Sequence, residues 1–244
     1  TEEGLRFIAA LAPVGGDLAL AWLDMSTGVF AVCHSDTEDL GALLARLSPS
    51  EILLPSNFDA DFGAEYTVLE TEILSSERAA HVLSDYFNVA NPSLLGDLSR
   101  AHIAACGTLL AYLQQTQIAQ MPRLARPHIE APEHHLGLDA ATRANLELTH
   151  TQTGEKTGSL LATIDMTVSA AGARELAERL AAPLGDMGAI CARHQAVRFF
   201  VDESAACEDL RQQLKNLPDM MRALSRLVLA RAGPRDLQAL GVGL

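Results

Sequence analysis

The chain has 244 residues, of which 48% are hydrophobic and 20% are charged. This composition is typical of a folded globular protein and excludes an intrinsically disordered chain. No apolar run approaches the roughly 20 residues that a membrane-spanning helix needs. The chain starts with the acidic Thr1-Glu2-Glu3, unlike the basic start of a secretory signal. We therefore expect a cytoplasmic protein that does not associate with membranes.

The net charge of −13 is distributed unevenly along the chain. Residues 1–119 contain 16 acidic residues and 4 arginines, a net charge of −12. Residues 120–244 contain 15 acidic and 14 basic residues, a net charge of −1. A strongly acidic surface repels the phosphate backbone of DNA. We expect the first half to face a protein partner or solvent rather than nucleic acid.

The first 75 residues contain short apolar runs that predict strands, namely Leu5–Ala12, Leu18–Met25, Val29–Cys33, Ile52–Leu54 and Tyr66–Leu69. Tight turns join the first three runs, which predicts an antiparallel meander. Between the third and fourth runs, leucines at positions 40, 43, 44 and 47 follow the helical period, and we expect a helix over Thr37–Leu47. Strands with an intervening helix indicate a small α/β layer.

Two helices and a proline-rich connection follow. The apolar positions of the first helix, which starts at Ser76, are Ala79, Val82, Leu83 and Phe87; the second is expected over Arg100–Gln117. Residues 121–135 contain Pro122, Pro127 and Pro132, and proline removes amide donors and restricts its predecessor. We expect an extended connection here and divide the chain into domains at 119/120, where the charge balance also changes.

Residues 120–244 are expected to be helical. A polar loop is expected at Thr149–Gly158, followed by a short apolar segment, Ser159–Asp165. The other helix starts carry capping residues or proline, namely Asp139, Thr167 or Ser169, Asp186, Ser204, Pro218 and Pro234. Short links between helices of similar length predict a helical bundle. The fold class is therefore α+β with two domains, an α/β domain over 1–119 and an all-α domain over 120–244.

One acidic turn could belong to a two-metal nuclease. Asp24-Met25-Ser26-Thr27-Gly28 joins two expected strands, as in ribonuclease-H-like nucleases, where carboxylates hold two metal ions. Such a site needs two or three converging carboxylates, and Asp17 and Glu51 are the only nearby candidates by strand position. A hairpin turn closed by its own aspartate explains the same residues, and we favour it.

Other motifs are weaker. His134-His135 has no third ligand at metal-binding spacing, so we expect a solvated linker. Gly154-Glu155-Lys156-Thr157-Gly158-Ser159 lacks the spacing of a phosphate-binding loop. The four cysteines form no CxxC pair, and we expect buried reduced thiols at positions 33, 106, 191 and 207.

The arginines near the end of the chain, Arg222, Arg226, Arg231 and Arg235, could contact DNA phosphates. Leucines and valines alternate with them, so we favour arginines that flank a packed face or pair with acidic neighbours.

Several of these segments resemble, in order and spacing, the MutS family of DNA mismatch repair proteins. The segments are Leu23–Gly28, Leu109–Gln117, Leu138–Leu148, Gly158–Leu161, Ile164–Thr167, Gly172–Arg174, Pro183-Leu184, Pro218-Asp219 with Arg222, Ser225–Leu227 and Pro234–Leu237. Each segment alone is weak evidence, but together they are specific. One departure is Arg179 before Leu180-Ala181-Ala182-Pro183-Leu184, where the family often has Trp.

The resemblance implies a ribonuclease-H-like connector domain, with a surface for a MutL-like partner, followed by the first part of a helical core that acts as a lever. It also implies that the intact protein binds mismatched double-stranded DNA, hydrolyses ATP with Mg²⁺ and forms a homodimer. The mismatch-reading, clamp and ATPase parts are not expected within these residues. We therefore expect no catalytic, cofactor or metal site here, and a monomeric fragment.

The resemblance implies that the connector and core couple the binding of mismatched DNA to the ATPase domain. Six residues stand in the resembling motifs and are candidates for a structural role in this coupling, namely Asp139, Arg143, Asn145, Arg174, Arg235 and Asp236. Two alternatives stay open: a two-metal nuclease that uses Asp24, and a free-standing scaffold related to MutS by descent only.

Overall fold

The structure is a computed structural model, and it describes residues 7–56, 58, 66–116, 121–130, 135–228 and 232–243. The chain forms two compact units, one made mainly of residues 1–132 and the other mainly of residues 133–244. The division lies further along the chain than the 119/120 boundary expected from the sequence. None of the described helices is long and apolar enough to cross a membrane.

The first unit is built on a mixed sheet of six strands in the order β5-β4-β1-β2-β3-β6. The strands are β1 (Phe7–Val14), β2 (Asp17–Asp24), β3 (Phe30–His34), β4 (Glu51–Leu54), β5 (Thr67–Glu70) and β6 (His128–Ile129). β1, β2 and β3 form the expected antiparallel meander, while β4, β5 and β6 each pair in parallel with a neighbour. The α/β class expected for this part of the chain is confirmed. Leu5, where the first strand was expected to begin, lies outside the described residues.

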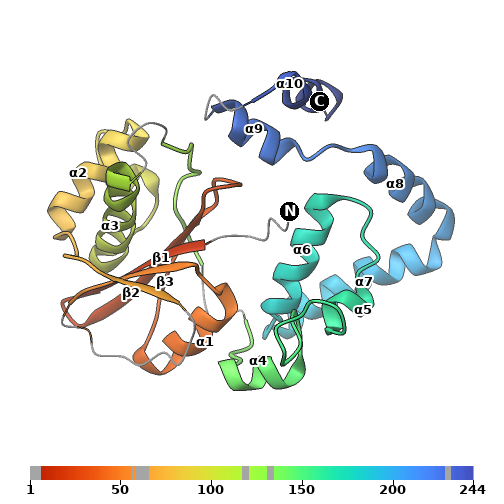
Figure 1. Cartoon of the computed structure of the whole chain (residues 1–244), viewed down its shortest axis with the longest axis horizontal. Helices are drawn as coiled ribbons and strands as arrows, with labels where there is room; N and C mark the ends of the chain where they lie inside the picture. Colours follow the sequence, from red (N-terminus) through yellow and green to blue (C-terminus); the bar gives the residue numbers. More distant parts are fainter. Residues whose placement is uncertain are drawn as a thin grey trace. The chain divides into compact units, whose positions relative to one another are not determined.

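Helices cover both faces of this sheet, as Figure 1 shows. The helices are α1 (Thr37–Leu47), α2 (Ser76–Phe87) and α3 (Arg100–Thr116), with a short 3-10 helix, η1 (Pro92–Leu95), that the sequence pattern did not predict. Alternate residues of β2 point to opposite faces: Ala21 and Leu23 pack with α2 and α3, whereas Leu20 and Trp22 pack with α1. The four leucines expected on one face of α1 are all buried, and each contributes about 2 kcal/mol on burial.

Residues 121–130, expected as an extended connection between the domains, belong to the sheet unit. β6 adds to the sheet beside β3, and Leu124 is buried in the core. No sequence pattern predicts β6, because it is only two residues long and lies between prolines. Gln117, Pro132 and His134 lie outside the described residues.

The second unit consists of α4 (Ala140–Leu146), α5 (Leu160–Ile164), α6 (Ala170–Ala181), α7 (Met187–Asp202), α8 (Ser204–Asn216), α9 (Met220–Val228) and α10 (Pro234–Gly243). Its helical class is confirmed. Asp139, Ser159, Ser169 and Asp186 each accept a hydrogen bond from a first-turn amide of the helix that follows. Ser169, and not Thr167, is therefore the N-cap of α6. α8 begins at Ser204, as expected, and Glu203 stands at its N-cap position without a side-chain cap hydrogen bond.

The expected close-packed bundle is not formed by the described residues of this unit. Of their apolar side chains only Ala182 and Ala223 are buried, whereas Val197 and Val201 of α7 remain 58% and 71% exposed. Each helix has the amphipathic or apolar pattern that predicts it, but within the described chain most of these faces have no partner.

Candidate functional site: arginine and aspartate pairs in the helical unit

The start of the helical unit is tied to the C-terminal end of α6. Asp139 caps α4 by accepting a hydrogen bond from the Thr142 amide at 2.6 Å, and hydrogen bonds from Thr142 lower the pKa of the Asp139 carboxyl. Arg143 Nε donates to the Leu138 carbonyl at 3.1 Å and Nη1 donates to the Ala181 carbonyl at 2.5 Å. A cation there also interacts favourably with the negative end of the α6 dipole.

His135 takes part in the same junction. Its Nδ1 lies 3.2 Å from the Ala182 carbonyl oxygen, and the Leu136 amide donates to Pro183 at 2.7 Å. The solvated linker expected at this histidine is therefore wrong, because the ring is held against the end of α6. Asn145, a further candidate, has an exposed side chain on α4.

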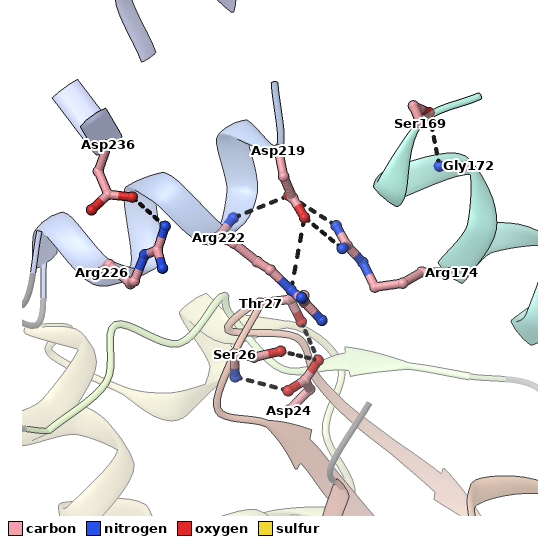
Figure 2. A network of polar contacts seen from close by, with 10 residues as sticks. All are labelled: Asp24, Ser26, Thr27, Ser169, Gly172, Arg174, Asp219, Arg222, Arg226 and Asp236. Atoms are coloured by element: carbon pink, nitrogen blue, oxygen red, sulfur yellow. Dashed lines mark hydrogen bonds and ion pairs between the residues drawn. The ribbon is translucent and has the colours of Figure 1, made fainter. Parts of the chain in front are cut away.

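A bidentate ion pair connects α6 to the segment before α9. Arg174 Nη1 lies 2.6 Å from Asp219 Oδ2, and Nη2 lies 2.9 Å from Oδ1. Both side chains are mostly buried, at 15% and 19% exposure. This planar two-bond geometry is available to arginine but not to lysine, so the pair fixes both the distance and the orientation of the two segments (Figure 2).

Asp219 also serves α9 itself. Its Oδ1 accepts from the Arg222 amide at 3.3 Å, and Arg222 Nε lies 3.7 Å from Oδ2. Burial alone would raise the pKa of Asp219, but the hydrogen bonds from Arg174 and the Arg222 amide and the two nearby positive charges outweigh it and lower that pKa. Asp219 is therefore a charged joint between two helices 45 residues apart in sequence.

A second pair lies at the start of α10. Asp236 accepts from the Gly233 amide at 2.8 Å and pairs with Arg226 of α9 (Figure 2). The pKa of Asp236 is lowered by the Gly233 amide and by Arg226, against an opposing effect of burial. Arg235, the neighbouring candidate, is exposed.

The candidate site residues predicted from the sequence include Arg174 and Asp236 but not their partners, Asp219 and Arg226. The preference for arginines that pair with acidic neighbours is confirmed for Arg222 and Arg226, while Arg231 lies outside the described residues. Asp219 could have been predicted from the sequence, because it follows Pro218 and stands three residues before Arg222. An aspartate at that spacing occupies the N-cap position of a helix.

Asp24 closes the turn between β2 and β3. Its carboxylate accepts from the Ser26 amide at 2.8 Å, the Ser26 hydroxyl at 3.0 Å and the Thr27 hydroxyl at 2.8 Å (Figure 2). Asp17 lies at the opposite end of the same eight-residue strand, and Glu51 accepts from the Tyr112 hydroxyl at 2.7 Å. Among the described residues, no group of three or more His, Cys, Asp or Glu side chains could hold a metal ion. The hairpin turn closed by its own aspartate is confirmed, because both oxygens of Asp24 serve the turn, and the described residues give the nuclease alternative no support.

The cysteine side chains of the two units differ in how deeply they are buried. Cys33 and Cys106 are buried as expected, and burial raises the pKa of Cys33 to about 12. Cys191 on α7 is exposed and Cys207 is half-buried, so the expectation of a buried thiol is wrong for Cys191. The reason is the sparse packing of the helical unit.

Comparison with known families assigns both units. Residues 6–128 match the family model described as MutS domain II, and residues 141–244 match that of MutS domain III. The chain belongs to the MutS family. The two matched segments correspond to the sheet unit and the helical unit of this MutS chain.

Relatives named DNA mismatch repair protein MutS are similar along nearly the whole chain. The protein of Rhodopseudomonas palustris (strain BisB5) is 46% identical over 98% of this chain, and that of Azorhizobium caulinodans is 45% identical over 93%. The protein of Dinoroseobacter shibae is 42% identical over 98% of the chain. This MutS chain spans about a quarter of the length of these relatives, 26% to 28%.

Proposed function

We propose that this chain is the connector and core segment of a DNA mismatch repair protein, where it couples the binding of mismatched double-stranded DNA to ATP hydrolysis elsewhere in the whole protein. In that protein we expect ATP with Mg²⁺ as the bound nucleotide, a homodimer as the assembly and the cytoplasm as its location. The chain itself would then act mechanically and carry out no chemistry.

The observation that carries this proposal is the Arg174–Asp219–Arg222 joint. A lever must keep the angle between its helices while force passes through it. A bidentate pair that is four-fifths buried holds two segments 45 residues apart in a defined orientation, which an exposed ion pair does not. Similarity to proteins named for mismatch repair supports the process in which this lever would act.

The charge distribution supports an interaction with protein at the connector. Residues 1–119 carry a net charge of −12, which disfavours direct DNA binding by this unit. We infer that a MutL-like partner, rather than DNA, contacts the connector. Salt-dependent binding of the whole protein to such a partner, weakened by charge reversal on the connector surface, would test this.

The coupling is tested with Asp219→Asn in a full-length Rhodopseudomonas palustris relative whose matching region is replaced by this chain. The substitution keeps the shape of the side chain but removes the charge that holds both arginines. We expect basal ATP hydrolysis and mismatch affinity to stay within about twofold, because both activities are proposed to reside outside this segment. The stimulation of hydrolysis by mismatched DNA should fall about tenfold, a coupling free energy in the usual range.

The matched control is Asp202→Asn, which removes an exposed pair with Arg198 in the same unit. Its stimulation should equal that of the unsubstituted protein. Unchanged stimulation in Asp219→Asn would contradict the lever. The gene sequence beyond this segment separates the proposal from a free-standing scaffold, since an ATP-binding motif downstream supports the repair protein.

A further inference from the structure

Residues 121–130, which we call the strap, follow α3 and lead toward the helical unit, yet they are bonded along their length to the sheet unit. The Ala125 amide donates to the Gly28 carbonyl at 2.7 Å, and the Glu130 amide donates to Val32 at 2.9 Å. The Glu130 carboxylate pairs with Arg46 of α1 at 2.5 Å. Backbone and side-chain contacts thus hold both halves of the strap.

Tyr86 on α2 supplies the contact at the start of the strap. Its hydroxyl donates to the Pro122 carbonyl and accepts from the Leu124 amide at 2.9 Å. One phenol thus satisfies an acceptor and a donor of a segment that has no strand partner at this point. Burial raises the pKa of Tyr86, so the hydroxyl keeps the proton that it donates.

Gly28 makes the close approach of the strap possible. Its φ of +77° is unfavourable for a residue with a side chain, and a Cβ atom there would lie 2.5 Å from the Arg123 carbonyl oxygen. At Gly28 the turn closed by Asp24 therefore presents backbone, with no side chain, to the strap.

We propose that Tyr86 is a positioning residue that fixes the strap to the sheet unit, so that residues 121–130 move with the connector and not with the helices. The consequence for coupling rests on the function proposed above; the fixation of the strap does not. A strap released from Tyr86 would absorb a movement of the connector instead of passing it on.

The test compares Tyr86→Phe with Tyr112→Phe, using amide hydrogen exchange in the full chain. Tyr112 is a matched control, because its hydroxyl makes a single hydrogen bond to Glu51, away from the strap, in the same unit. Tyr86→Phe should raise exchange at Leu124 and Ala125 at least tenfold and leave Leu109, in the buried centre of α3, within twofold. Tyr112→Phe should change neither strap amide.

An equal effect of the two substitutions at Leu124 would overturn the fixation, as would a uniform rise across α3, which indicates loss of global stability.

The second measurement is ATP hydrolysis stimulated by mismatched DNA in the full-length chimera. We expect Tyr86→Phe to lower the stimulation at least threefold relative to Tyr112→Phe. If exchange rises while stimulation holds in Tyr86→Phe but falls in Asp219→Asn, the consequence of the strap for coupling is overturned, while its fixation by Tyr86 and the lever both stand. If neither substitution changes stimulation, the lever fails as well, although the strap remains fixed by Tyr86.

Discussion

The imidazole of His102 takes the place that glutamate has in many helix N-termini. Ser99 Oγ accepts from the His102 amide at 3.2 Å, and the Ser99 amide donates to His102 Nδ1 at 3.3 Å. This reciprocal pair is a capping box at the start of α3. Because Nδ1 must accept, the box requires a neutral ring with its proton on Nε2, which is buried and has no hydrogen-bond partner among the described residues.

Burial, and the ring of His34 at 4.1 Å between centroids, lower the pKa of His102 from 6.5 to about 4, while Asp17 acts in the opposite direction. Above pH 6.5 neither the folded nor the unfolded chain holds this proton. Between pH 6.5 and 4 only the unfolded chain binds it, so the free energy of unfolding falls as the pH falls. The loss should reach roughly 2–3 kcal/mol near pH 4.

Urea denaturation at pH 7.5 and 4.5 measures this loss. His102→Gln keeps an acceptor at the box and does not titrate, so its stability should depend less on pH than that of the unsubstituted chain. His81→Gln, on the exposed side of α2, is the control and should keep the original dependence. Identical pH profiles for His102→Gln and the unsubstituted chain would refute the role of this ring.

At the scale of elements, the packing of α3 on α2 depends on one glycine. A Cβ atom at Gly107 would lie 2.6 Å from Ala79 Cα and 2.8 Å from its carbonyl oxygen. Neither is the end of a flexible side chain, so the helices must separate to admit a methyl group. Gly107→Ala should therefore lower the free energy of unfolding by about 2 kcal/mol or more, as overpacked cores do.

Gly41→Ala is the control, since Gly41 lies within α1 with open space around its Cα. Alanine there should raise the stability by about 0.5–1 kcal/mol, because glycine loses more backbone entropy in a helix. The two substitutions make the same chemical change and should shift thermal unfolding in opposite directions. Shifts of the same sign would show that the contact with Ala79 does not control the packing.

At the scale of the whole molecule, the two units differ in how much apolar surface they bury. The sheet unit buries large side chains on both faces of its sheet, including Phe30, Leu44 and Leu109. In the described part of the helical unit Phe199 of α7 is 54% exposed. Regions with few buried apolar contacts open locally at low free energy.

Amide exchange along the full chain should reflect this difference. We expect protection in the centres of α3 and β2 to exceed that in the centres of α7 and α8 by at least a hundredfold. Exchange at equal rates in α3 and α7 would contradict the burial difference. Addition of the rest of the protein should raise the protection of α7, because a partner would cover its apolar face.

Sequence alone determined the features that depend on neighbours a few residues apart. The leucine period of α1, the caps at Asp139 and Asp186, the meander from β1 to β3 and the two-unit α+β class all follow from local pattern, because a helix face or a turn is encoded within one segment. The motif order also predicted the family.

Only the tertiary structure decided which distant groups meet. Arg174 pairs with Asp219, Tyr86 bonds to the strap and β6 pairs with β3 because packing brings these segments together. The residues in these contacts lie 36 to 97 positions apart, and no local spacing encodes a contact over that separation.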